Sequence, residues 1–284
     1  MTAGIVLPRE SDLYQLLRQA ALERRCVFLA GLPGVGKSLM LQQLALIADE
    51  VGRAVHLLQW DVVRGAFETP DILKRYPEVN GITHAAIRKA VGLWARDGVR
   101  RWDQAHDGTR DMLIGETPLI GNRLIELAQP SDDDVEPLLA GSQSLFLIPA
   151  PSRAVRQAIE ASRAREMASP RHKREVANAP PSLVQAYWEE LDRVARQLGL
   201  ARSGPGDGYE PDVYVSVYRR LLRHRRAATL PITSVLPVRD SPYEMGRVAS
   251  ELTSTPEDVE RIMLRVDAHP EAQLQRDVDN WFEI

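Results

Sequence analysis

The 284-residue chain has few cysteines, no long apolar run and little net charge, and each of these absences excludes a class of protein. Cys26 is the single cysteine, so no disulfide can form within the chain, which is typical of a reducing cytoplasm. No apolar run approaches the length of about 18 residues that a membrane span requires, and the first residues lack the pattern of a signal peptide. The formal net charge of -3 gives no field that attracts nucleic acid or membrane surfaces. We therefore expect a cytoplasmic protein without membrane contact.

One motif organises the rest of the chain. The apolar residues Cys26–Ala30 run into a loop with the spacing G-x-x-x-x-G-K-S, and strong helix formers follow from Leu39 to Ala48. A strand, a glycine loop and a helix form the context that a phosphate-binding loop (P-loop) requires. The expected nucleotide-binding residues are Gly31, Leu32, Pro33, Gly34, Val35, Gly36, Lys37, Ser38 and Leu39.

The residue types in this loop fit the chemistry of a nucleoside triphosphate. Glycines permit backbone angles and a close approach that a Cβ would obstruct, and the start of the next helix favours an anion. We expect Lys37 to reach the β- and γ-phosphates and the Ser38 hydroxyl to bind Mg²⁺. ATP and Mg²⁺ are therefore the predicted ligands.

Further apolar segments predict the architecture. Strands are expected at 54–59, 110–116, 144–148 and, less regularly because of Pro231, near 229–236. The helices between them predict an α/β fold: a three-layer P-loop NTPase sandwich with a mainly parallel five-stranded sheet. We expect a core at 1–200 with a basic helical lid at about 152–181, and a segment at 201–284 that completes the sheet and adds helices. The predicted helices lie at 11–24, 80–105 (one long helix or a pair, with Gly98 as the expected break), 119–129, 152–178, 182–198, 212–226, 255 onward and 270–284.

Missing motifs narrow the choice among nucleotide-binding proteins. The chain has no N/T-K-x-D motif, which a GTPase uses to read its base, and no L-S-G-G segment of an ABC-type ATPase. Oligomeric motors usually carry Asp-Glu after the third strand, whereas this strand ends in the lone Glu116. Small P-loop kinases remain.

The segment after the second strand supports a kinase. Asp61 and Arg64 form a D-x-x-R element that resembles the one in adenylylsulfate kinase, chloramphenicol phosphotransferase and zeta-toxin-like kinases, in which both residues meet the phosphoryl acceptor. A carboxylate there can take the proton of an attacking hydroxyl, and an arginine can hold an anionic acceptor. The alternative is that Asp61 caps the following helix and Arg64 is solvated.

Other charged residues are candidates with open alternatives. The basic run after the fourth strand predicts a lid that closes on the triphosphate, with Arg163 and Arg171 as its catalytic arginines, although such a run can also be a solvated helix face. Glu116 can hold the water shell of Mg²⁺ or cap the next helix. For Arg123 we expect a surface position rather than one in the acceptor pocket.

These observations predict an ATP-dependent phosphotransferase that acts on a small-molecule acceptor, with Lys37, Asp61, Arg64, Arg163 and Arg171 as catalytic residues and Ser38 and Glu116 at the metal. Two alternatives remain. One is a kinase that acts on a nucleic acid, suggested by the arginines between 219 and 226. The other is a regulatory or assembly ATPase.

Overall fold

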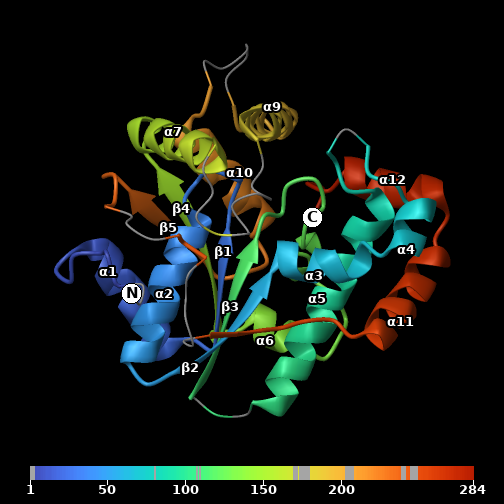
Figure 1. Ribbon diagram of the computed structural model, residues 1–284, viewed down its shortest axis with the longest axis horizontal. Coiled ribbons are helices and arrows are strands. Elements are labelled where there is room, and N and C mark those ends of the chain that lie inside the picture. The colour runs from blue at the N-terminus through green and yellow to red at the C-terminus, as the bar shows by residue number, and fades with distance from the viewer. Residues whose placement is uncertain are drawn as a thin grey trace.

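The computed structural model of the chain describes residues 4–284 except 80, 107, 109, 169–171, 173–179, 202–207, 238–240 and 244–248. Its centre is a six-stranded sheet in the order β5-β4-β1-β3-β2-β6, in which neighbouring strands run parallel (Figure 1). The carboxyl ends of the strands therefore meet at one edge. The strands are β1 Cys26–Ala30, β2 Ala54–Gln59, β3 Asp111–Thr117, β4 Ser144–Pro151, β5 Ala227–Ile232 and β6 Ala249–Glu251.

Helices cover both faces of this sheet because successive side chains of β1 point to opposite sides. Val27 and Leu29 pack in one core with α1 (Asp12–Glu23) and α2 (Lys37–Glu50). Phe28 packs in the other core, which the remaining helices cover. These are α3 Trp60–Phe67, α4 Pro70–Arg75, α5 Ala85–Ala105, α6 Glu136–Ala140, α9 Pro181–Gln197, α10 Pro211–Leu221, α11 Pro256–Asp267 and α12 Glu271–Asp279, while α7 Arg153–Ala168 follows β4 near the carboxyl edge.

Most predicted elements are confirmed. Ser11 caps α1 by accepting a hydrogen bond from the backbone N–H of Tyr14. Thr255 and Asp258 form a capping box at the start of α11. Trp281 anchors the C-terminal end with 1% of its surface exposed. Burial raises the pKa of Cys26 to about 12, so this thiol is a small core residue, as expected.

Three predictions about the elements are wrong. Residues 119–129 form no α-helix: Leu119, Asn122 and Leu124 have positive φ angles, and only the short 3-10 helix η1 (Ile125–Leu127) follows. The expected break at Gly98 does not occur, since α5 continues through this residue to Ala105; the Trp94 ring lies beside the glycine. The sheet has six strands rather than five, because Ala249–Glu251 adds β6 beside β2.

The strand that contains Pro231 is confirmed as β5, but it ends at Ile232 rather than at 236. It pairs with β4 alone and forms one edge of the sheet, where proline is tolerated because its missing N–H removes no central hydrogen bond. None of the helices in the described part of the chain has the length and apolar content that a bilayer crossing requires.

Candidate functional site

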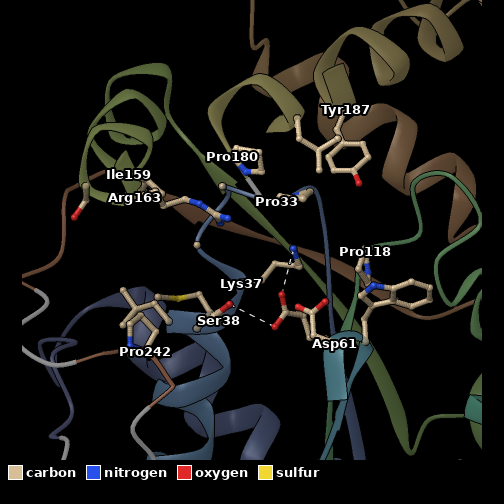
Figure 2. A pocket seen from close by; sticks show the side chains of 18 of the residues that line it. Pro33, Lys37, Ser38, Asp61, Pro118, Ile159, Arg163, Pro180, Tyr187 and Pro242 are labelled. Carbon is tan, nitrogen blue, oxygen red and sulfur yellow. Dashed lines mark hydrogen bonds and ion pairs between the residues drawn. The ribbon is translucent and has the colours of Figure 1, made fainter. Parts of the chain in front are cut away.

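A cavity of about 1300 Å³ opens at the carboxyl edge of the sheet (Figure 2). Its walls come from the glycine loop after β1, the ends of β2 and β3, helices α7 and α9, and the segment after β5. Segments far apart in the sequence thus meet at one site. The predicted residues that line it are Pro33, Gly34, Gly36, Lys37, Ser38, Leu39, Asp61, Arg64, Glu116 and Arg163.

The glycine loop has the backbone that its sequence predicts. Gly34 and Gly36 have φ angles of 81° and 86°, a region that other residues rarely adopt, and Gly36 directly precedes α2. A Cβ on Gly31 would collide with the hydroxyl of Tyr214, so this position also requires glycine. Leu32 and Val35 do not line the cavity, because both side chains are buried in the core beneath the loop.

Lys37, Ser38 and Glu116 form a connected group on the cavity floor. The Lys37 Nζ donates a hydrogen bond to the carbonyl of Leu32 at 2.9 Å and lies 3.4 Å from Oε1 of Glu116. The Ser38 hydroxyl donates to Oε2 of Glu116 at 3.4 Å. Burial lowers the pKa of Lys37, and the carboxylate of Glu116 opposes this shift.

This group offers suitable ligands for Mg²⁺. The ion prefers oxygen ligands at about 2.1 Å in octahedral geometry, so adjacent ligands lie about 3 Å apart. The Ser38 hydroxyl and the Glu116 carboxylate are close to this separation, so both residues fit the predicted metal role. Glu116 is the penultimate residue of β3, and no regular helix starts directly after it, which removes the helix-capping alternative.

Asp61 lies in the first turn of α3 and Arg64 in its last turn, and both residues line the cavity. The Asp61 side chain is 63% exposed to the open cavity, and its Oδ1 lies 3.7 Å from Nη2 of Arg64. The surrounding walls raise the pKa of Asp61, while Arg64 and Lys37 oppose the shift. Arg64 is not solvated: it also contacts Glu68 at 3.2 Å and the Thr83 hydroxyl at 3.4 Å.

The basic segment after β4 divides into residues with different surroundings. Arg163 reaches from α7 toward the cavity (Figure 2), and Arg165 also lines it. Arg156 is instead buried in the packing of α7, where it pairs with Glu160. The predicted Arg171 lies outside the described residues.

Arg123 is where the sequence-based expectation fails most clearly. It is 7% exposed rather than on the surface, and it lines the cavity. Its guanidinium lies over the rings of Trp60 and Tyr187, at 5.9 Å and 4.9 Å from their centroids. The irregular backbone around Leu119 and Leu124 turns the side chain inward, and a helical pattern could not reveal this.

Another wall comes from the chain after β5. Pro242 and Tyr243 line the cavity, and the backbone is held there by a hydrogen bond from the Gln42 amide to the Ser241 carbonyl at 3.0 Å. Burial raises the pKa of Tyr243 to about 12, so its phenol is protonated at neutral pH. By its position after the fifth strand, the turn at 237–242 is where the sequence predicts the nucleotide base to rest; residues 238–240 of this turn lie outside the described part of the chain.

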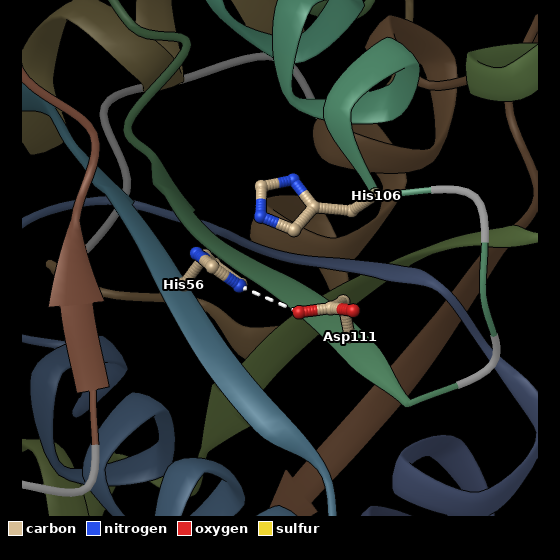
Figure 3. Close-up of side chains that lie close together, drawn as sticks. All are labelled: His56, His106 and Asp111. Carbon is tan, nitrogen blue, oxygen red and sulfur yellow. Dashed lines mark hydrogen bonds and ion pairs between the residues drawn. The ribbon is translucent and has the colours of Figure 1, made fainter.

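A second group of polar side chains lies near the amino ends of β2 and β3, on the side of the sheet away from the cavity (Figure 3). His56 Nε2 is 3.0 Å from Oδ1 of Asp111, with His106 beside them. The other His56 nitrogen is 3.1 Å from the Ser250 hydroxyl. Arg53 donates a hydrogen bond to the Asp111 carbonyl, which places a cation beside the group. Because hydrogen bonds satisfy His56 and a cation is already present, we assign this group to joining β2, β3 and β6.

No family model, curated protein or solved structure matches the chain. The function is therefore argued from the cavity alone.

Proposed function

We propose that the chain is a cytoplasmic P-loop kinase, which transfers the γ-phosphoryl group of ATP to a small-molecule acceptor. The observation that carries the proposal is the shared cavity: the glycine loop with Lys37 forms one wall, and the Asp61 carboxylate projects into the same space. In this proposal the sheet and its helices form a P-loop NTPase fold, α7 is the lid, and the D-x-x-R element is the acceptor site.

Each residue of the site has its own role in the proposed phosphoryl transfer. The glycine loop and Lys37 hold the phosphates, and Arg163 places positive charge beside the transferring group. Ser38 and Glu116 would hold Mg²⁺, which supplies charge neutralisation on the phosphate oxygens. The acceptor hydroxyl attacks the γ-phosphorus, its proton passes to Asp61, and the bond to the β,γ-bridging oxygen breaks to release ADP. The raised pKa of Asp61 makes it a better proton acceptor at neutral pH.

Substitutions at Lys37 and Asp61 test this proposal. Lys37→Ala is expected to abolish turnover because the phosphates lose their buried cation. Asp61→Asn is expected to bind ATP as the wild-type chain does and to lose transfer by about 100-fold or more, the range of general base catalysis. The measurements are nucleotide binding by calorimetry and ADP release during a screen of acceptors. Wild-type transfer by the Asp61→Asn variant would contradict the acceptor role.

The second candidate is a regulatory or assembly ATPase, and one observation favours it: Glu116 lies beside Ser38, where a carboxylate can also orient an attacking water. Hydrolysis at full rate without any acceptor, with a specific activity that rises with protein concentration, would select this candidate. The kinase predicts slow hydrolysis that an acceptor diverts into transfer.

A nucleic-acid acceptor has less support than the sequence suggested. Arg225 belongs to the arginine-rich segment that motivated it, but this side chain is buried and bonded to Glu136 at 2.7 Å. Arg219 donates a hydrogen bond to the Thr229 hydroxyl. A gel-shift series at low salt tests the remaining surface charge, since phosphate contacts would make binding steeply salt-dependent.

A further inference from the structure

Two buried arginines stand where the main cavity meets a smaller one of about 370 Å³. Arg123 and Tyr187 line both cavities, while Arg88 lines the smaller one. Arg88 and Arg123 are 9% and 7% exposed. Both guanidiniums approach Gly121, which has a positive φ angle and no side chain to separate them. Two cations are therefore held close together beside the proposed acceptor site.

Neither arginine has a carboxylate partner within 4.0 Å in the described part of the chain. The Arg88 Nη1 donates to the carbonyl of Gly121 at 2.7 Å, and its Nε is buried with no hydrogen-bond partner among the described residues. The Arg123 Nη1 donates to the carbonyl of Ile120 at 3.0 Å. A guanidinium has five donors, so carbonyl bonds leave most of them unused and leave the charge uncompensated.

The other buried arginines in the described part of the chain have carboxylate partners. Arg96 pairs with Asp133 and Glu136, at 2.6 Å and 2.9 Å, and Arg225 pairs with the same Glu136. Arg156 pairs with Glu160. These three buried arginines are thus neutralised by carboxylates, whereas the hydrogen bonds that the half-buried Arg53 makes within the described residues go to backbone carbonyls. Arg88 and Arg123 depart from this rule, and they do so at a cavity.

The surrounding acidic groups do not replace a ligand. Glu190 and Asp279 line the smaller cavity, but Glu190 accepts a hydrogen bond from the Trp281 indole at 2.8 Å, and neither carboxylate reaches an arginine within 4.0 Å. Burial and the charge of Arg123 lower the pKa of Arg88 to about 10, the direction expected of an uncompensated cation. The Arg123 guanidinium lies over the rings of Trp60 and Tyr187, which favour a cation, and the residue lines both cavities.

We propose that Arg123, with Arg88 behind it, binds an oxyanion group of the phosphoryl acceptor: a phosphate, sulfate or carboxylate carried on the same molecule as the hydroxyl that faces Asp61. That the ligand is a phosphoryl acceptor rests on the proposed kinase function. The anion site itself rests on the two arginines that lack a carboxylate partner. Planar guanidiniums bind such oxyanions through paired hydrogen bonds.

The test measures anion binding after the glycine loop has been filled. The full chain is saturated with Mg²⁺ and a non-hydrolysable ATP analogue, and inorganic phosphate, sulfate and acetate are then titrated by calorimetry. We expect at least one anion to bind saturably. Arg123→Met and Arg88→Met should each weaken this binding by about tenfold to a hundredfold, the range for lost charge-assisted hydrogen bonds. The exposed Arg219→Met is the matched control and should bind as the wild-type chain does.

The preferred anion then identifies the acceptor class. Phosphate or sulfate binding indicates a tetrahedral dianion, and acetate binding indicates a carboxylic acid. Absence of saturable binding, or equal binding by the Arg123→Met and wild-type chains, would overturn the inference. Removing an uncompensated cation should leave the unliganded protein as stable or more stable, so cooperative melting of both variants separates lost binding from lost folding.

A separate experiment distinguishes failure of the anion site from failure of the proposed kinase function. If the ATP analogue does not bind, the kinase proposal fails, and the phosphate titration is repeated on Lys37→Met, in which the glycine loop lacks its lysine. If phosphate binding then persists in the Lys37→Met variant and is lost in the double variant that also carries Arg123→Met, the result supports the anion site without the kinase function. Phosphate binding that is absent in Lys37→Met overturns it.

Discussion

At the scale of single residues, Gly92 shows how packing can reverse a helix preference. It lies inside α5, where alanine is normally the better residue by about 1 kcal/mol. A Cβ at this position would run into the carboxylate of Glu126, which is 4% exposed and paired with Lys89 at 3.1 Å. The buried carboxylate would have to move away from its lysine to make room.

We therefore expect Gly92→Ala to destabilise the protein by about 1–3 kcal/mol, the usual cost of overpacking. Gly65→Ala in α3 is the matched control. A Cβ at Gly65 meets no atom within 4 Å, so this variant should be as stable as the wild-type chain or up to about 1 kcal/mol more stable. Urea unfolding measures both. A neutral or stabilising Gly92→Ala substitution would contradict the packing argument.

At the scale of elements, Asp258 joins α11 to α5. Its carboxylate accepts hydrogen bonds from the Trp94 indole at 3.2 Å and from Arg101 at 2.9 Å, and it also completes the capping box of α11. The Arg101 guanidinium holds the pKa of Asp258 well below its usual value, although burial acts in the opposite direction. The ionised form therefore stabilises the packing of these two helices.

This shift gives a pH dependence with a definite sign. The pKa is lower in the folded state, so the stabilisation is complete above the unfolded-state value of about 3.9 and is lost as the pH falls through the folded value. We expect Asp258→Asn to cost about 2–4 kcal/mol at pH 7, because Arg101 and Trp94 lose their ionised partner. The difference from the wild-type chain should shrink below about pH 4. Urea midpoints at pH 7, 5 and 3 measure it; a constant difference would contradict the assignment.

The elements also show what the sequence can reveal. Apolar runs predict β1 to β4 because each strand is buried in a parallel sheet, and the P-loop pattern predicts the cavity floor. The three residues of β6, Ala249–Glu251, carry no apolar pattern, so pairing with β2 determines this strand. Leu119 and Leu124 adopt left-handed angles that leucine rarely prefers, so tertiary contacts override the helical pattern. Arg88 and Arg123 were missed as a pair because that loop brings them together.

At the scale of the whole molecule, the C-terminal segment provides both edges of the sheet. β5 pairs with β4 at one edge, and β6 pairs with β2 at the other. Between these two strands in the sequence, Pro242 and Tyr243 line the cavity. After β6, the helices α11 and α12 cover the core with Ile262, Val266 and Leu274, all of them buried. This part of the chain is thus integral to the fold.

Truncation tests this conclusion. Removing residues 249–284 exposes the edge of β2 and the apolar core beneath α11, so we expect loss of cooperative unfolding and of soluble yield. Removing only Glu283 and Ile284 keeps the buried Trp281 and Phe282, and this shorter truncation should melt within a few degrees of the full chain. A soluble 1–248 chain with a sharp thermal transition would show that the core is complete without α11.

The position of β6 also constrains how the protein is made. A ribosome releases the glycine loop and β2 long before it releases Ala249–Glu251, so the nascent sheet keeps an open strand edge through most of translation. During that interval the unfinished molecule already carries its glycine loop but lacks the Tyr243 wall of the cavity. A chaperone that shields β2 would therefore protect this protein at its most vulnerable stage.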